Sequence, residues 1–170
     1  MVLDGGLSVD IHPICNIINN SMITIDLRTI PKGHSHQEFE WTLLAGDSPR
    51  ENKETAVIGR FDINNKFDRD YDFKGIIEFD VKLKCDRCAE IFEKHFTEEV
   101  RFIIKKNSMI EDLDIINTNS NIVKLKSYIK DIVHTAIPMQ NICSEDCKGI
   151  CSGCGVNLNK EKCKCNKQED

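Results

Sequence analysis

The sequence has no long apolar run and no excess of positive charge. None of its hydrophobic stretches approaches the ~18 residues that cross a bilayer, and its first residues carry acidic side chains where a secretory signal would be basic. We therefore expect a cytoplasmic protein with no membrane partner. The formal net charge of -5 argues against a self-sufficient nucleic-acid binder, which normally carries a basic excess. Any direct contact with RNA should be local.

Motifs for catalysis are also missing. The chain has no nucleophile elbow, no glycine-rich phosphate loop and no His-Glu-x-x-His sequence. Acidic pairs such as Glu98 and Glu99 are adjacent, and on a strand adjacent side chains point to opposite faces. We name no catalytic residue, expect no small-molecule substrate, and predict that the protein is not an enzyme.

What is present is the composition of a folded chain. Hydrophobic residues make up 40% and charged residues 30%, and 170 residues suffice for one main domain. Apolar and polar residues alternate, as in strands with one solvent-facing side, over 22–27, 37–43, 55–63, 71–83 and 91–104. We predict an α+β protein with an antiparallel β domain over 1–106. Whether this sheet closes into a barrel-like form stays open.

A change of pattern follows the predicted sheet. Residues 107–121 are rich in Asn, Asp and Glu without periodicity, which predicts a linker or mobile loop. Apolar residues then recur at helical spacing: Leu125, Tyr128, Ile129, Ile132, Val133 and Ala136. Pro138 should end this helix. We predict an amphipathic helix within 122–138 that packs on the apolar face of the sheet, the alternative being a helix that binds a partner.

Nine cysteines are more than packing requires in a reducing compartment, where thiols remain available to a metal. Six of them lie within 143–165, a segment with almost no large apolar residues. Such a segment cannot offset its chain entropy by burial, so we predict that 139–170 is a zinc-binding tail. Eight cysteines form four short-spaced pairs, which are the candidate metal ligands: Cys85 and Cys88, Cys143 and Cys147, Cys151 and Cys154, Cys163 and Cys165.

The spacing favours zinc, which binds four thiolates in a tetrahedron, because a Cys-x-x-Cys turn supplies two of them. Gly155 follows the second cysteine of one such turn and is free to adopt a positive φ, which lets backbone N–H groups approach the sulfurs. The Cys151 and Cys154 pair is expected to close one site with Cys163 and Cys165.

The remaining two pairs leave alternatives open. Cys85 and Cys88 lie at the tip of a predicted hairpin. They either share a second ion with Cys143 and Cys147, which would face one side of a helical turn, or the ligands are distributed differently. We expect one or two Zn²⁺ ions per chain. Positively charged residues near the thiolates should help to hold the metal: Lys84, Arg87, Lys148, Lys162 and Lys164.

Other interpretations of the thiols and imidazoles are weaker. A redox dithiol at Cys85 and Cys88 would need a helix N-terminus beside it, whereas the flanks are predicted strands. Cys15 is interpreted as a small buried apolar residue. None of the five histidines is named as a ligand: His12, His34, His36, His95 and His134.

Three features occur in order along the chain: a Cys-x-Arg-Cys turn at 85–88, a helix ending in Ile137 and Pro138, and the motif Cys-Ser-Glu-Asp-Cys-Lys-Gly-Ile-Cys-x-x-Cys-Gly-x-x-Leu-Asn at 143–159. Together they resemble the YceD family. The resemblance runs from about 21 to 165. It implies a mainly antiparallel β fold with a helix and a requirement for accumulation of the large ribosomal RNA, and the family is not known for catalysis. This chain departs from the family pattern at Lys124, where Asp is usual, and at His134 and Thr135, where apolar residues are commoner.

The leading hypothesis is a zinc-binding ribosome biogenesis factor needed for accumulation or processing of the 23S ribosomal RNA. Its expected partner is the precursor large subunit, reached through RNA, a ribosomal protein or both. Tail lysines near the metal are the expected source of a few phosphate contacts. The alternatives are a zinc-dependent protein adaptor and a thiol redox or zinc sensor.

Overall fold

The computed structural model describes residues 23–44, 53–110, 112 and 114–165. Cys15 and His12 lie outside the described residues. The elements run in the order β1 Thr24–Asp26, a short 3-10 turn Leu27–Thr29, β2 Gly33–Leu44, β3 Glu54–Lys66, β4 Asp70–Lys84, β5 Ile91–Lys106, β6 Ile115–Thr118, β7 Ile122–Lys124 and α1 Lys126–Ala136.

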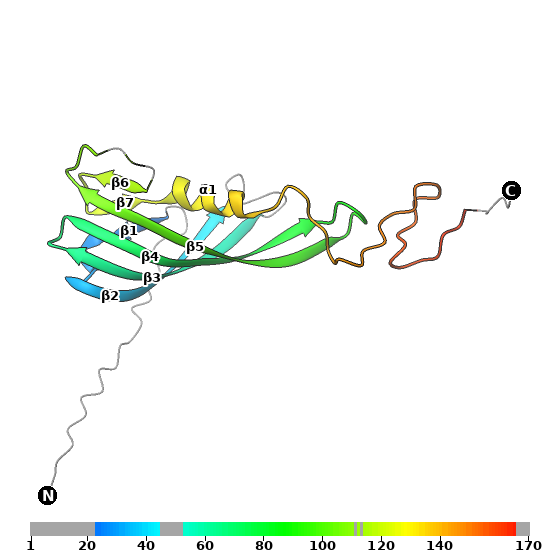
Figure 1. Ribbon diagram of the computed structural model, residues 1–170, viewed down its shortest axis with the longest axis horizontal. Helices are drawn as coiled ribbons and strands as arrows, with labels where there is room; N and C mark the ends of the chain where they lie inside the picture. The colour runs from blue at the N-terminus through cyan, green and yellow to red at the C-terminus, as the bar shows by residue number, and fades with distance from the viewer. Residues whose placement is uncertain (1–22, 45–52, 111, 113, 166–170) are drawn as a thin grey trace, which may run out of the picture.

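The main sheet has five strands in the order β2-β3-β4-β5-β6 (Figure 1). Its first four strands are antiparallel, and β6 is parallel to β5. The strands predicted from alternation at 37–43, 55–63, 71–83 and 91–104 are confirmed as the central parts of β2 to β5. The α+β class is therefore confirmed.

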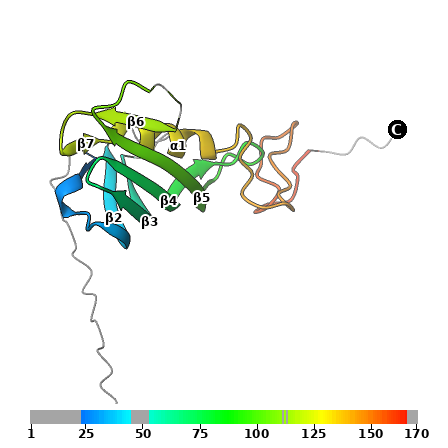
Figure 2. The same cartoon turned by 60° about the vertical axis from the view of Figure 1, so that its left-hand side comes forward.

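The barrel-like closure does not occur. Among the described residues β2 and β6 are the two edges of an open sheet, and they do not pair with each other. Helix α1 and the short antiparallel pair β1–β7 lie over the inner face instead (Figures 1 and 2), so they cover apolar surface that a closed barrel would have buried.

Two short segments behave differently from their sequence pattern. The 107–121 segment, expected to be a linker, contains β6, whose Ile115 pairs with Ile103 of β5. Within the 22–27 run, Thr24–Asp26 form β1, which pairs with β7 rather than with the main sheet. Segments of three or four residues are too short to show a period, and their pairing partners lie far away in sequence.

The core lies between the inner face of the sheet and α1. Phe61, Phe73 and Phe102 are fully buried from three adjacent strands, and the rings of Phe73 and Phe102 stack with centroids 4.7 Å apart. Tyr128 of α1 meets the Phe102 ring edge-on at 5.1 Å. Burial of one such side chain stabilises the fold by about 1.5–3 kcal/mol. The packing of the amphipathic helix on the sheet is thus set by its apolar stripe.

The ends of α1 agree with the sequence. Ile137 is extended, with ψ 119°, because the following Pro138 disfavours a helical residue before it. At the other end the N-cap is Leu125, which makes no side-chain hydrogen bond, and the first turn contains no acidic residue. Lys124 therefore lies near the positive end of the helix dipole, where an acidic side chain would stabilise the helix.

Candidate metal centres

The β4–β5 hairpin ends in a six-residue loop that carries Cys85 and Cys88. Within it the Ala89 N–H donates to the Cys85 carbonyl at 2.9 Å, and the Cys85 N–H donates to the Glu90 carbonyl at 2.8 Å. Ala89 has a φ of 60°, the left-handed conformation that this tight turn requires. The turn directs both thiols to one side of the hairpin tip.

The tail returns to this tip and brings two more thiols. The Sγ atoms of Cys85 and Cys147 are 3.8 Å apart, and those of Cys88 and Cys143 are 3.7 Å apart. All four sulfurs lie within 4.8 Å of one another, and we call these four residues the inner cluster. Cys85 is 1% exposed and Cys147 is 7% exposed.

Backbone and polar side chains hold the tail against the tip. The Asp86 N–H donates to the Asn141 carbonyl at 2.8 Å, and the Asn141 N–H donates to Asp86 Oδ2 at 2.6 Å. Arg87 Nη1 donates to the carbonyls of Glu145 and Cys147, each at 3.3 Å. The side chains around the inner cluster therefore fix both of the chain segments that supply its cysteines.

The tail then forms a second group of four thiols. Cys151 Sγ lies 3.4 Å from Cys163 Sγ and 3.7 Å from Cys165 Sγ, and Cys154 Sγ lies 3.9 Å from Cys163 Sγ. These sulfurs also lie within 4.8 Å of one another, and we call the four residues the outer cluster. Cys163 and Cys165 are exposed, in contrast to the thiols of the inner cluster. Gly155 has a φ of 73°, which confirms the positive value expected after the second cysteine.

The outer cluster is attached to the same hairpin tip. Glu90 forms an ion pair with Lys160 at 2.8 Å and accepts a hydrogen bond from Asn157 Nδ2 at 3.3 Å. The Ile150 N–H donates to the Arg87 carbonyl at 3.0 Å. Gly149, at a φ of 73°, allows this close approach, because a Cβ there would lie 3.0 Å from the Arg87 oxygen.

The sulfur geometry fits a tetrahedral ion. Zn–S bonds of about 2.3 Å in a tetrahedron place the sulfurs about 3.8 Å from one another. Five of the sulfur separations, 3.4 to 3.9 Å, are close to this value, and within each cluster none exceeds 4.8 Å. They are far longer than a disulfide of about 2.05 Å, and these eight cysteines are free. Both donor sets therefore suit a thiophilic cation such as Zn²⁺.

Hydrogen bonds to sulfur support the same geometry. The backbone N–H groups of Cys143 and Lys164 donate to Cys85 Sγ and Cys154 Sγ, each at 3.4 Å. Asn159 Nδ2 donates to Cys147 Sγ, also at 3.4 Å. Donors of this kind stabilise negative sulfur and orient metal ligands.

The inner cluster divides into thiols with lowered and raised pKa values. Burial raises the pKa of Cys85, but backbone N–H donors led by Cys143 outweigh it and lower that pKa to about 6. Burial also opposes the lowering at Cys147, whose pKa falls because Asn159 and the Gly149 N–H donate to it. Burial and the neighbouring thiols raise the pKa of Cys143 to about 12.

The outer cluster shows the same division. The Val156 and Lys164 N–H groups lower the pKa of Cys154 to about 6. The thiol of Cys163, followed by those of Cys151 and Cys154, raises the pKa of Cys165 to about 12. Four thiolates at this spacing repel one another, so a cation is needed to deprotonate all four.

The structure thus brings the eight candidate cysteines together as two sets of four, Cys85, Cys88, Cys143 and Cys147 in one and Cys151, Cys154, Cys163 and Cys165 in the other. One detail differs, because 143–147 forms a turn rather than a turn of helix, with the Cys147 N–H donating to the Ser144 carbonyl at 3.1 Å. Of the expected cations, Arg87 binds the tail backbone, whereas Lys164 pairs with Glu161 at 2.6 Å.

Sequence reasoning missed the residues that fasten the clusters. Asn141 is 3% exposed and donates to the Pro138 carbonyl at 3.2 Å, and Glu90 holds Lys160. Asn159 was the last residue of the recognised tail motif, but the motif alone gave it no role. Its position two residues before Cys143 is the sequence signal that could have pointed to Asn141.

The described histidines are not part of either cluster. His36 Nδ1 is 3.1 Å from Asp62, and His95 Nδ1 is 2.9 Å from Asp80, both on the outer face of the sheet. Among the described helices none is long and apolar enough to cross a membrane.

In the described residues, fold and site together define a class: an open, mainly antiparallel sheet with one helix, in which a tail packed on the tip of the β4–β5 hairpin forms two candidate four-cysteine metal centres. Comparison with known proteins makes this more specific. The chain belongs to the family described as large ribosomal RNA subunit accumulation protein YceD, whose model matches residues 73–170. The matched part includes most of β4, together with β5, α1 and all eight clustered cysteines.

Two curated plant proteins are similar over a shorter stretch. Both are named large ribosomal RNA subunit accumulation protein YCED homolog 1, chloroplastic. The protein from Arabidopsis thaliana is 45% identical over 47 residues, which are 28% of this chain and 15% of that protein. The protein from Zea mays is 36% identical over 44 residues, which are 25% of this chain and 15% of that protein. The matched stretch thus spans about 15% of each relative. No solved structure matches.

Proposed function

We propose that this chain is a non-catalytic, zinc-binding ribosome biogenesis factor that promotes accumulation of the 23S ribosomal RNA and acts on the precursor large subunit. The observation that carries the proposal is membership of the YceD family over the part of the chain that contains the hairpin, the helix and both clusters. The relatives' names describe accumulation of an RNA rather than a reaction.

The proposal assigns one Zn²⁺ to each cluster, with all eight cysteines as ligands. The ion would supply the positive charge that lets four thiolates lie together, and it would cross-link segments that bury little apolar surface of their own. Reduced protein purified without chelator should contain two zinc ions per chain by elemental analysis. A value near zero, or iron in place of zinc, would contradict this assignment.

The function is tested in the source organism. Depletion of the protein should lower the ratio of large to small subunit RNA, and the protein should sediment with precursor large-subunit particles in wild-type cells. A normal ratio after depletion, together with absence of the protein from every ribosomal fraction, would refute the biogenesis role. We place the protein in the cytoplasm, with RNA, a ribosomal protein or both as its contact on the particle.

A thiol or zinc sensor is the second candidate, and one observation favours it. Cys163 and Cys165 are exposed, so solvent oxidants reach the outer cluster directly. A sensor should release zinc reversibly under mild peroxide and change its partner binding when it does so. A biogenesis factor would lose function under those conditions without gaining a new partner.

A further inference from the structure

The end of the molecule opposite the tail carries a basic pocket. A cavity of about 300 Å³ lies where the β3–β4 turn meets the end of β5. These two segments are at the left of Figure 1. Four cations and one carboxylate are among the residues that line it: Lys66, Arg69, Lys105, Lys106 and Asp70. This local excess of positive charge contrasts with the net charge of -5 of the whole chain.

The positive charge of the pocket is not neutralised by ion pairs among the described residues. Lys106 Nζ contacts the neutral amide oxygen of Asn121 at 2.5 Å. Lys66, Arg69 and Lys105 make no ion pair within the described part of the chain. The adjacent Asp68 is occupied by Lys32 at 3.0 Å. The pocket therefore presents cations that are available to an anionic ligand.

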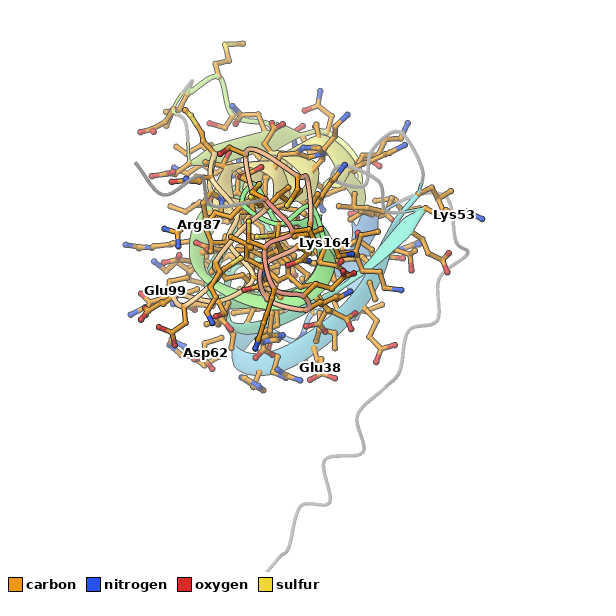
Figure 3. All side chains as sticks on the ribbon, turned by 90° about the vertical axis from the view of Figure 1, so that its right-hand side faces the viewer. Glu38, Lys53, Asp62, Arg87, Glu99 and Lys164 are labelled. Atoms are coloured by element: carbon orange, nitrogen blue, oxygen red, sulfur yellow. The ribbon has the colours of Figure 1, made fainter. Side chains whose placement is uncertain are left out.

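The outer face of the sheet is different. Arg60 pairs with Glu38 at 2.6 Å, and Arg101 pairs with Asp72 at 3.1 Å. Figure 3, which views the molecule from the tail end, shows Glu38, Asp62 and Glu99 pointing away from the sheet on the side that α1 leaves uncovered. On this surface the two arginines are paired with carboxylates and do not attract phosphate. Charge therefore favours the pocket as the place where an anionic ligand binds.

A second feature points to a nucleotide rather than a simple anion. Phe67, at the tip of the β3–β4 turn, lines the pocket and is 89% exposed. Its φ is 58°, a left-handed conformation that is unusual for a bulky residue and in which Asn or Gly is less strained. The fold thus holds an aromatic ring in water beside four cations. Aromatic rings next to cations are how proteins bind unpaired bases and their phosphates.

The turn that carries Phe67 is preorganised. The buried Asn65 accepts from the Asp68 N–H at 3.0 Å and donates to the Ile30 carbonyl at 3.1 Å. The Lys106 N–H donates to the Arg69 carbonyl at 2.8 Å, which joins the turn to the end of β5. The two basic segments are therefore fixed relative to each other before a ligand binds.

We propose that this pocket binds unpaired RNA, with Phe67 stacking on a base while Lys66, Arg69, Lys105 and Lys106 contact the flanking phosphates. The choice of RNA as partner rests on the proposed function, whereas the site itself rests on the pocket. This position differs from the tail lysines that the sequence suggested, and it lies at the other end of the molecule.

Binding is tested with the full chain and a labelled, unstructured RNA of about 12 nucleotides, a length that covers one such site. Lys66→Gln/Arg69→Gln should weaken binding at least tenfold at low salt and make the logarithmic salt slope shallower by about 1.4, because two phosphate contacts are lost. The charge-matched control is Lys53→Gln/Lys74→Gln, which removes two exposed cations away from the pocket and should change affinity less than twofold. An equal effect of both double variants would overturn the proposal.

Phe67→Asn separates the role of the ring from folding. Asn tolerates a positive φ, so this variant should be at least as stable as the wild type while binding RNA about five- to a hundredfold more weakly. Unchanged affinity would overturn the stacking role. Absence of wild-type binding, or equally strong binding of a polyglutamate peptide, would overturn RNA as the ligand.

Complementation distinguishes this inference from the proposed function. If the wild-type gene restores the RNA ratio in depleted cells and the pocket variants do not, both are supported. If variants that no longer bind RNA restore the ratio fully, the pocket inference is wrong and the function stands. If depletion itself leaves the ratio normal, the proposed function is wrong whatever the binding data show.

Discussion

The inner and outer clusters use the same turn in different surroundings. In each, the residue after the second cysteine donates to the carbonyl of the first at 2.9 Å, from Ala89 to Cys85 and from Gly155 to Cys151. The inner cluster packs against Phe92 and Ile142, whereas two of the outer thiols are exposed. The local turn therefore supplies two ligands in either setting, and the surroundings decide how accessible the site is.

The two clusters also differ in what they connect. The inner cluster joins Cys85 and Cys88 of the hairpin to cysteines more than fifty residues later, as the 62-residue separation of Cys85 and Cys147 shows. The outer cluster joins residues at most 14 apart, Cys151 and Cys165. The first is a long-range cross-link between sheet and tail, and the second is a local one within the tail.

The largest expected effect comes from breaking the inner cluster. Cys88→Ser/Cys143→Ser should remove one zinc ion, and with it a binding free energy on the order of 10 kcal/mol, because two of four ligands are lost. Amide protection should disappear over 138–149, while β2 to β5 stay protected. Hydrogen exchange with elemental analysis provides the measurement.

The matched variant is Cys151→Ser/Cys154→Ser, which removes two ligands from the outer cluster. Protection should be lost only over 150–165, and the inner zinc should remain. If this variant releases both ions, the two clusters form one cooperative unit. That result would contradict the distinction between a long-range and a local cross-link.

A smaller effect is expected in the rate of metal loss. Added chelator should remove zinc in two phases, with the outer ion leaving first because Cys163 and Cys165 are exposed while Cys85 is 1% exposed. A coloured metallochromic indicator follows the release. The Cys151→Ser/Cys154→Ser variant should lack the fast phase, and its persistence there would reverse the assignment.

The pairing of cysteines shows where prediction from sequence ends. Alternation over 71–83 and 91–104 correctly placed Cys85 and Cys88 at a hairpin tip. The four thiols expected from their spacing to lie together do so, namely those of Cys151, Cys154, Cys163 and Cys165. Local pattern cannot say which distant segment returns to the tip. That depends on contacts such as Asp86 to Asn141, which join residues 55 apart.

The basic pocket was hidden for a similar reason. Lys66 and Arg69 lie far from Lys105 and Lys106 in sequence, and only the β4–β5 register, in which Asp70 faces Lys105, brings them together. Phe67 lies between the predicted strands 55–63 and 71–83, so neither its exposure nor its φ can be inferred from their alternation. The net charge of -5 indicated only that any contact with RNA should be local, and it could not say where that contact lies.

The smallest expected effect tests whether the two turns are equivalent. Gly155→Ala places a Cβ in open space, so only its φ of 73° is unfavourable, and the outer cluster should lose about 1 kcal/mol of stability. Ala89→Gly relieves the same strain at a φ of 60° and should stabilise the hairpin tip by about 0.5 kcal/mol. Local exchange rates and zinc affinity measure both changes. Effects of the same sign would show that the turns are not equivalent.

The uninterrupted length of β4 has a consequence for any assembly that this protein joins. Its 15 residues, Asp70–Lys84, run from the basic pocket to the loop that carries the inner cluster. At about 3.3 Å per residue they hold the two ends about 45 Å apart. Because β5 pairs with all of β4 and β3 pairs with its residues 70–79, this spacing cannot shorten without loss of strand pairing. Engaging both ends at once would therefore require a ligand or particle of at least that dimension.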